Sequence, residues 1–358
     1  MWRRKGMNVE RFVKDLIHIK QTNDSLTRVI GAGLSVALPM LIGLWSGNMK
    51  FGTLGALGAF AFLSYTPLPI PKLAKRILKA GLGIMAGFYL GLLSTLIPWT
   101  IPIAISFVSL AGFLVVRCLQ IPNPGAFFLI MVSSMGTGMK LEFSQMLPAV
   151  GYVGGGVLAS ILMAVLTGYI NQYYLKRPVE DNHKSYKERI KYAIEHDSDL
   201  LLTSIHHAGI IFFAAYISQA LGFMNPYWVT ISTAAVLAGK EIRIVFYRNV
   251  QRIVGGLVGL IIGFYLLSLH LDVIPTIILI VIFTFLVEIC MVRNYAVANF
   301  FTNPVSLMLS HLSSGLFITD LVQYRLLGLV VGSIIGFIGA ALIELGLRIK
   351  EKRFTFLK

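Results

Sequence analysis

Charged residues are scarce in this sequence. Asp, Glu, Lys and Arg make up 13% of its 358 residues, whereas soluble domains carry about 25%. So few charges cannot cover the surface of a soluble globular protein, and the composition excludes that class. Cysteine is scarce too, since Cys118 and Cys290 are the only two in the chain. Both are expected at span ends on the reducing side of a membrane, which argues against a disulfide.

Catalytic sequence patterns are also missing. The chain has no paired carboxylates, no Cys and His at metal-binding spacings, no phosphate-binding loop and no nucleophile elbow. We therefore expect a protein that is not an enzyme and that holds no metal or other cofactor. Without an ATPase segment, any active transport would draw on an ion gradient. The N-terminal residues lack the short apolar core and cleavage site of a signal peptide, so we expect no removed leader.

Apolar residues dominate instead. They make up 56% of the chain, and the mean hydropathy is +0.77. Apolar stretches recur along the chain and approach the roughly 20 residues that cross a bilayer as a helix. The sequence therefore predicts an all-α polytopic membrane protein with about 12 transmembrane helices. The predicted spans are residues 27–46, 51–65, 73–96, 98–117, 124–139, 147–174, 200–221, 227–239, 249–269, 272–292, 294–312 and 319–347.

The placement of the basic residues predicts the orientation. A net charge of +15 is compatible with nucleic-acid binding, but most of it gathers on one side of the predicted spans. With the N-terminus inside, only Lys50, Lys140 and Arg325 of the 31 Lys and Arg fall near the outer side. Because cytoplasmic loops are rich in Lys and Arg, we place both termini in the cytoplasm and the protein in the plasma membrane. Membrane lipids are then expected partners, and nucleic acid is not.

Three basic segments flank the spans. Residues 1–26 carry apolar side chains on one helical face and predict an amphipathic helix lying on the inner leaflet. Residues 176–199 form a charged linker, expected to be helical, and residues 349–358 form a basic tail. All three are expected in the cytoplasm.

One apolar line occurs twice in the chain. Residues 76–90 read RILKAGLGIMAGFYL, and residues 252–266 read RIVGGLVGLIIGFYL. The match continues where FLVVRC at 113–118 corresponds to FLVEIC at 285–290. The two halves of the chain are therefore interpreted as copies of one unit.

The number of spans fixes how such copies relate. Six spans return the chain to its starting side, so the copies, residues 27–175 and 200–348, share one orientation. The sequence predicts two parallel six-helix repeats related by a pseudo-twofold axis along the membrane normal. A pathway along this axis is one reason to keep two copies. The alternative is that the duplication only builds a stable bundle.

Arg76 and Arg252 open the two copies of the repeated line. An arginine costs about 2.5–3.5 kcal/mol at the centre of a span and less near the interface. These two lie about one helical turn inside, so they either reach out to lipid phosphate or serve a function. Together with Arg117 and other basic residues on the inner side, they would form a positive vestibule that attracts anions.

Glycine rows follow both arginines. Gly83 and Gly87 in the first copy correspond to Gly259 and Gly263 in the second. The ordinary meaning of such rows is close packing of helices. The alternative is a bare helix face that borders an open path.

Aromatic residues supply further candidates for the substrate pathway. The second span of each half is short, and short segments at matching positions of two repeats point to a transporter's binding site. Tyr227 and Trp228 begin the later of these spans and either line that site or belong to an interfacial aromatic belt. Tyr89 and Tyr265 close the repeated lines and can stack on an aromatic ring, unless they serve Phe-rich packing.

Glu288 is the carboxylate that lies well inside a predicted span. Its repeat position is next to Arg117, so Glu288 is expected to pair with Arg117 or with Arg293. A buried carboxyl group can also carry protons, and proton coupling through Glu288 is therefore a hypothesis. His206 and His207 are further candidates for a proton relay.

Two motifs carry a resemblance to a known family. Residues 226–237 read PYWVTISTAAVL, and residues 248–259 read RNVQRIVGGLVG. With these motifs the chain resembles the fusaric acid resistance family, the FUSC or aromatic acid exporter group, and more distantly the plant aluminium-activated malate channels. The resemblance implies export of organic anions, commonly aromatic carboxylates, from the cytoplasm. By position, Tyr227, Trp228 and Arg252 match the motif residues of the family.

The chain also departs from the family pattern. Gly256 stands where the family usually has threonine. In the first half Arg76 remains, but Phe51 and Gly52 occupy the places of the tyrosine and the tryptophan. Many relatives hold a large cytoplasmic domain where this chain has a short linker. These departures bear on the substrate more than on the fold.

The sequence thus predicts a membrane exporter of organic anions. Arg76 and Arg252 would attract the negative group, the tyrosines would line the route, and Glu288 would couple export to proton entry. A passive anion channel is one alternative. A lipid-handling or scaffold protein whose arginines hold phosphate headgroups is another. Both a monomer and a homo-oligomer fit the sequence.

Overall fold

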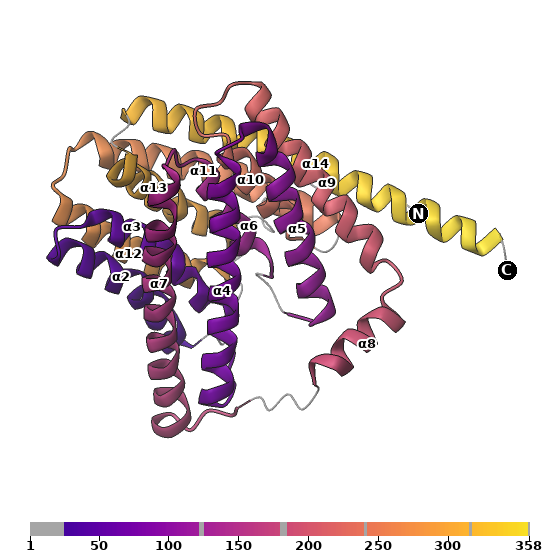
Figure 1. Ribbon diagram of the computed structural model, residues 1–358, viewed down its shortest axis with the longest axis horizontal. Helices are drawn as coiled ribbons and strands as arrows, with labels where there is room; N and C mark the ends of the chain where they lie inside the picture. Colours follow the sequence, from indigo (N-terminus) through magenta and orange to yellow (C-terminus); the bar gives the residue numbers. More distant parts are fainter. Residues whose placement is uncertain (1–24, 122–124, 180–184, 240–241, 315–316, 357–358) are drawn as a thin grey trace, which may run out of the picture.

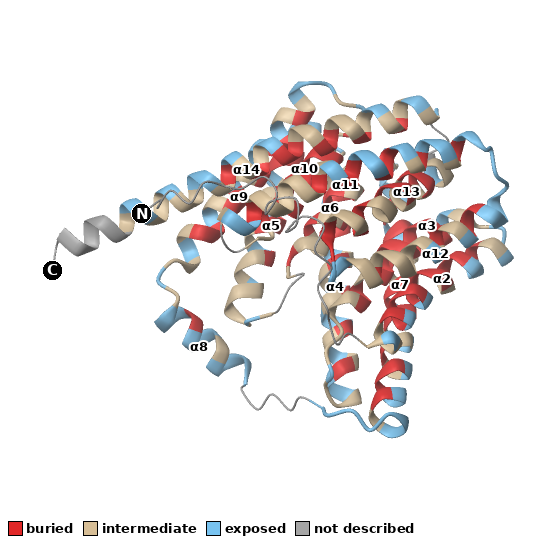
Figure 2. Ribbon diagram, turned by 180° about the vertical axis from the view of Figure 1, so that it is seen from behind, coloured by how far each residue is buried: buried red, intermediate tan, exposed pale blue. Residues whose placement is uncertain are grey.

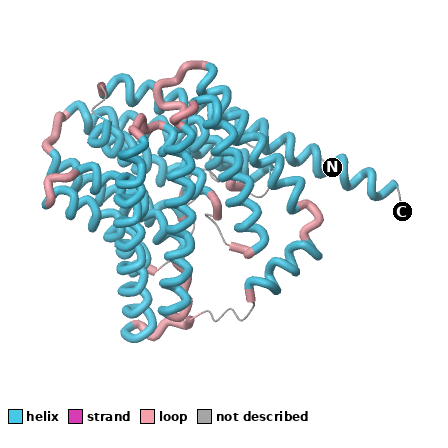
Figure 3. Tube along the Cα trace, viewed as in Figure 1, coloured by secondary structure: helices cyan, strands magenta, loops and turns pink. Residues whose placement is uncertain are grey.

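The computed structural model describes residues 25–121, 125–179, 185–239, 242–314 and 317–356. Within these ranges the chain forms helices and loops and no strand (Figure 3). The first half comprises α2 (Leu26–Trp45), α3 (Met49–Gly58), the 3-10 segment η1 (Ala59–Ser64), α4 (Ile70–Ser94), the 3-10 segment η2 (Pro98–Thr100), α5 (Ile101–Cys118), α6 (Phe127–Thr137), α7 (Phe143–Tyr169) and the π-helical segment η3 (Ile170–Tyr174). The second half comprises α9 (Leu200–Ala220), α10 (Tyr227–Leu237), α11 (Ile242–Ser268), α12 (Val273–Met291), α13 (Tyr295–Ser314) and α14 (Ile318–Phe356).

The charged linker between the halves contains α8 (Tyr186–His196). Its first turn is closed by a capping box, in which Ser185 Oγ accepts from the Glu188 amide and the Glu188 carboxylate accepts from the Ser185 amide. At the other end of the chain, α14 continues beyond the bundle into the basic tail (Figure 1). The amphipathic helix expected near the N-terminus lies outside the described residues.

Eight of the described helices are long and apolar enough to cross a membrane. Three further apolar helices are shorter: residues 49–64, 127–137 and 227–237. The prediction of an all-helical, multi-pass membrane protein is confirmed at this level. Every predicted span overlaps a helical segment of the structure, while the complete set of spans stays a prediction.

The helix contacts occur in matching pairs. In the first half α4 packs against α6 and α7, and α3 packs against α7 (Figure 1). In the second half α11 packs against α13 and α14, and α10 packs against α14. Contacts between the halves are paired as well, because α5 meets α9 as α12 meets α2, and α6 meets α10 as α3 meets α13. Reciprocal contacts of this kind are those of two equivalent units that face each other.

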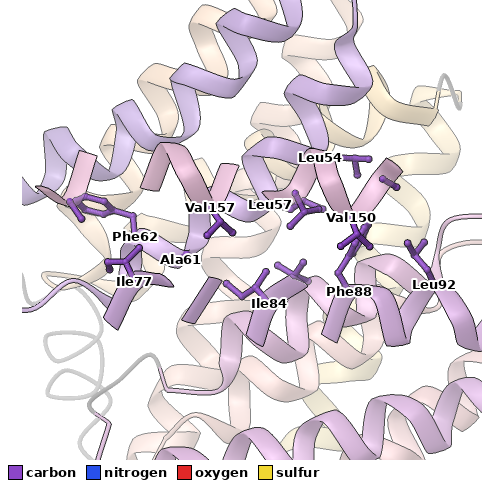
Figure 4. Packing of buried hydrophobic residues seen from close by; sticks show 14 of the residues in the cluster. Leu54, Leu57, Ala61, Phe62, Ile77, Ile84, Phe88, Leu92, Val150 and Val157 are labelled. Atoms are coloured by element: carbon purple, nitrogen blue, oxygen red, sulfur yellow. The ribbon is translucent and has the colours of Figure 1, made fainter. Parts of the chain in front are cut away.

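Apolar side chains fill both the first half and the boundary between the halves. Leu57, Phe62, Ile84, Phe88 and other residues of α3, η1, α4 and α7 form one buried cluster (Figure 4). A second cluster joins Val36, Met40, Ala56 and Ala59 of the first half to Trp228, Ile231, Leu260, Leu307 and Leu329 of the second. Buried residues gather where α10, α11 and α13 meet, whereas α8 is largely exposed (Figure 2). The boundary on which the sequence placed an axial path is thus packed with apolar side chains.

Three of the four matched glycines serve close helix packing. A Cβ atom built on Gly259 would lie 2.3 Å from the carbonyl oxygen of Asn299 on α13, and one on Gly87 would lie 2.2 Å from Ser133 Oγ on α6. A Cβ on Gly263 would meet Leu307 of α13 at 2.7 Å. Only Gly83 has no atom within 4 Å of such a Cβ. The packing interpretation therefore holds for three of them, and these three border no open path.

Candidate functional site

Arg252 lies inside the second half, between three helices. It is on α11, and 5% of its surface is exposed. Nη1 donates to the Tyr295 hydroxyl of α13 at 3.0 Å, and Nη2 donates to the Ser232 hydroxyl of α10 at 3.1 Å. Nε is buried and has no hydrogen-bond partner in the described part of the chain. The guanidinium is thus fixed by two neutral hydroxyl groups, and its Nε donor stays unused.

Arg325 of α14 lies in the same half and is equally buried, with 5% exposed. Nε donates to Asn303 Oδ1 at 3.0 Å, and the guanidinium carbon lies 5.0 Å from the centre of the Trp228 ring. The sequence placed Arg325 near the outer membrane surface, and it did not identify it as a site residue. In the structure its side chain turns into the bundle toward α10 and α13.

Residues of α13 connect the two arginines. Asn303 accepts from Arg325 through Oδ1, and its amide nitrogen lies 3.4 Å from the Gly256 carbonyl oxygen on α11. The Tyr295 hydroxyl holds Arg252, and a third arginine, Arg248, lies with its guanidinium carbon 4.3 Å from the Tyr295 ring centre. We call this set the arginine row; its members are Arg248, Tyr295, Arg252, Asn303, Arg325 and Trp228.

No carboxylate neutralises the arginine row within the described residues. The ion pairs among the described residues join Arg28 to Glu288, Arg117 to Asp197, Lys191 to Glu195, Arg348 to Glu344 and Lys350 to Asp199. Burying a cation without an opposite charge is costly in a membrane, where such residues pair or line a pathway. An arrangement of buried guanidinium groups and neutral donors is suited to receive an anion.

The described residues also hold no grouping of three or more His, Cys, Asp or Glu that could bind a metal ion.

Arg76, the repeat mate of Arg252, lies elsewhere. Its side chain is half-buried, and Nε donates to the Ser64 carbonyl oxygen at the end of η1, at 2.8 Å. None of the contacts of Arg252 involves Arg76. The two arginines are therefore not in direct contact, and each reaches toward the second span of its own half.

The aromatic candidates are divided by the structure. Trp228 is 1% exposed and Tyr227 is partly buried beside it, with their ring centres 5.6 Å apart. Trp228 is thus in the protein interior and not in an interfacial belt. Tyr89 packs against the apolar cluster of the first half. Tyr265 is 64% exposed and lines no part of the arginine row.

Arg117 and Glu288 also have other partners than expected. Arg117 forms an ion pair with Asp197 at 2.5 Å, and its Nη1 donates to the Thr203 hydroxyl. Glu288 is buried and pairs with Arg28 of α2 at 3.6 Å. The predicted pairing of Glu288 with Arg117 or Arg293 is wrong, because α12 packs on α2 while α5 packs on α9.

The two histidine candidates lie on α9. The His207 Nδ1 atom is 2.8 Å from the Ser109 hydroxyl of α5, and its ring stacks on Phe113 with centres 4.5 Å apart. The His206 Nδ1 atom is 2.8 Å from the Leu202 carbonyl oxygen of its own helix. His207 thus belongs to the boundary between the halves, and neither histidine touches the arginine row.

An ion pair lies at each of the two long boundaries between the halves. Helix α5 supplies the cation of one pair, whereas its counterpart α12 supplies the anion of the other. On one, the cation Arg117 of α5 holds Asp197 just before α9. On the other, the anion Glu288 of α12 holds Arg28 of α2. Because both pairs bridge the halves, any movement of one half against the other has to break or carry them.

Exchanging the charges of Arg28 and Glu288 tests this role. Glu288→Gln is expected to destabilise the protein by about 3 kcal/mol, since it removes the carboxylate of a largely buried ion pair with Arg28. The double variant Arg28→Glu with Glu288→Arg should regain most of that loss. Thermal unfolding in mild detergent measures both. A double variant that is no more stable than Glu288→Gln would exclude a direct pair.

Comparison with known proteins agrees with the position of this site. Residues 213–339 match a family model described as fusaric acid resistance protein-like, and this segment contains the whole arginine row. The match confirms the resemblance inferred from the sequence. The chain is also 21% identical to an uncharacterized membrane protein, YvaC, of Bacillus subtilis (strain 168), over an alignment of 470 residues that covers 92% of this chain and 74% of the relative. No solved structure matches significantly. The similarity to plant malate channels stays a prediction.

Proposed function

From a second half that matches the fusaric acid resistance protein-like family, we propose that this protein exports small organic anions across the plasma membrane. The single observation that carries the proposal is Arg252, a buried cation held by two hydroxyl groups and by no carboxylate of the described chain. An anion that binds there would supply the missing negative charge. The protein then acts as a transporter and not as an enzyme.

The chemistry of the two halves is unequal, which supports one binding site in the second half. Continuing the alignment of residues 113–118 with 285–290 places Met131 opposite Asn303. Gly52 likewise stands where the second half has Trp228. The first half therefore retains Arg76, while Met131 and Gly52 stand where the second half has Asn303 and Trp228.

The arrangement of the halves is part of the proposal. We infer two six-helix repeats related by a pseudo-twofold axis along the membrane normal, and the paired helix contacts support this relation. The anion route then lies beside the axis, within the second repeat. With both termini in the cytoplasm, as the basic residues indicate, α11 and α13 begin on the inner side. Arg248 would meet the anion first and Arg252 next.

An aromatic carboxylate is the substrate class that best suits this surrounding. The rings of Tyr295, Trp228 and Tyr227 lie next to the guanidinium groups. A ring on the anion could stack on them while its carboxylate binds arginine. Aliphatic anions would use only the charge.

Coupling to protons is the second part of the hypothesis. Glu288 and His207 lie at the boundaries between the halves, where a change of protonation would act on movement of one half against the other. A passive channel would need no such coupling. A protein that binds lipid phosphate would bind anions at the surface, whereas Arg252 is buried.

Reconstituted vesicles test the proposal. Vesicles containing the protein are loaded with 4-nitrobenzoate, and its release is followed with and without a pH gradient. We expect faster release than from loaded vesicles without the protein, and still faster release when a pH gradient is present. Release that follows only the anion's Nernst potential would favour a channel. No release of this or any aliphatic carboxylate would contradict the proposed function.

A further inference from the structure

We propose that Arg325, Asn303 and Trp228 form a second anion-binding station, distinct from that at Arg252, and that a carboxylate passes from one to the other. The inference rests on the proposed function, because the direction in which the carboxylate passes is that of the proposed export route. The station itself would bind a monocarboxylate with an apolar or aromatic body. Its two parts are a buried cation and an aromatic wall.

The cation of this station is available for a ligand. Arg325 is 5% exposed and, in the described structure, forms no ion pair. Its hydrogen bonding within the described residues is confined to Nε, which donates to Asn303. The two terminal nitrogens of the guanidinium therefore keep their donors, in the fork geometry that binds a carboxylate through both oxygens.

Asn303 holds that fork in place. Its Oδ1 accepts from Arg325, and its Nδ2 faces the Gly256 carbonyl oxygen on α11. Since the amide is engaged on both sides, it fixes the direction of the Arg325 side chain. It also stands between Arg325 and the helix that carries Arg252, so it separates the two stations.

The two stations lie at different depths along α13. Tyr295, which holds Arg252, begins the helix, whereas Asn303, which holds Arg325, comes eight residues later. At 1.5 Å per residue this is a separation of about 12 Å between the two anchoring residues. An anion that leaves one guanidinium is attracted by the positive charge of the next.

Trp228 provides the wall of the second station. Its ring faces the Arg325 guanidinium at 5.0 Å and is buried, with 1% exposed. A cation over an aromatic face is stabilised without being neutralised. The same ring offers an apolar surface to the body of the ligand, which favours aromatic and branched carboxylates over inorganic anions.

The fluorescence of Trp228 reports on this station directly. The chain has 4 Trp, and replacing Trp2, Trp45 and Trp99 by phenylalanine leaves Trp228 as the only one. Trp45 and Trp99 are exposed, so these changes are expected to leave the bundle intact. The probe is 4-nitrobenzoate, which quenches indole, and the neutral control is 4-nitrobenzyl alcohol. Saturable quenching by the acid, and not by the alcohol, is expected.

Variants of the two arginines then separate the stations. Arg325→Gln is expected to weaken the quenching affinity by about tenfold or more, through loss of a charge-assisted hydrogen bond. Arg325→Lys, which keeps the charge, should restore part of it. Arg252→Gln should lose flux and keep the quenching. Thermal unfolding of each variant shows that the bundle has formed.

The outcomes distinguish this inference from the function on which it rests. Quenching that requires Arg325 in a protein that moves no carboxylate would uphold the station and contradict the exporter. Normal flux together with quenching that is unchanged in Arg325→Gln would overturn the station and leave the exporter standing. Equal quenching by the alcohol would also overturn it, because the site would then not depend on charge.

Discussion

Arg252→Gln is expected to lower carboxylate flux by about 100-fold. A charge-assisted contact to the anion contributes about 1.5–3 kcal/mol, and its loss would weaken both the binding of the anion and its transfer. The variant removes the positive charge but can still hydrogen-bond to Ser232 or Tyr295. The protein should therefore fold. Initial rates of 4-nitrobenzoate release from vesicles, at several concentrations, measure the loss.

Arg76→Gln is the matched control for this prediction. Arg76 occupies the same position of the repeated line, but its side chain is bound to the Ser64 carbonyl oxygen of its own half. The carboxylate flux of Arg76→Gln is expected to stay within about threefold of the flux of the original protein, which corresponds to less than about 1 kcal/mol. Equal losses in both variants would instead support the paired arginines inferred from the sequence and would argue against a route confined to the second half.

Gly259→Ala is expected to destabilise the protein by about 3 kcal/mol, the upper end of the effect of overpacking. The added Cβ would lie 2.3 Å from the Asn299 carbonyl oxygen and 3.1 Å from Asn303 Cβ. Because the first of these is a backbone atom, α11 and α13 would have to move apart. That movement would also separate Arg252 from Tyr295, so flux should fall together with stability.

Gly83→Ala is the control for this second prediction, because Gly83 is the repeat mate of Gly259 and has nothing within 4 Å of an added Cβ. Alanine is a better helix former than glycine by about 1 kcal/mol, so this variant should be as stable as the original or more so. Thermal unfolding in mild detergent compares the two. Similar stability of both variants would show that α11 and α13 do not approach as closely as the structure indicates.

Much of the fold follows from the sequence because a membrane simplifies folding. A span has to be a helix of sufficient apolar length, so hydropathy alone places the helices within a few residues of those in the structure. The repeated line beginning at Arg76 and at Arg252 likewise identifies two similar halves. The partners of side chains do not follow in this way. Glu288 meets Arg28 and not Arg117, because that choice depends on which helices cross between the halves.

The site shows the same division. Trp228 and Arg252 were identified from a short motif, and both lie in the arginine row. Arg325 and Asn303 carry no local signal, since an arginine seven residues into a helix is equally compatible with a membrane surface. A sequence signal appears only when the two halves are aligned, because a polar residue of the second half then aligns with an apolar residue of the first.

The sequence by itself determined that this protein is a helical membrane protein, that one apolar line occurs in both halves, and that arginines and aromatic residues mark its second half. The physical reason is that crossing a bilayer demands uninterrupted apolar helices, which composition and periodicity reveal. Only the tertiary structure decided that Arg248, Arg252 and Arg325 gather away from any carboxylate of the described chain. Such convergence depends on the close approach of α11 and α13 at the glycines of α11 and on the direction in which Arg325 turns, and neither is encoded in a local pattern.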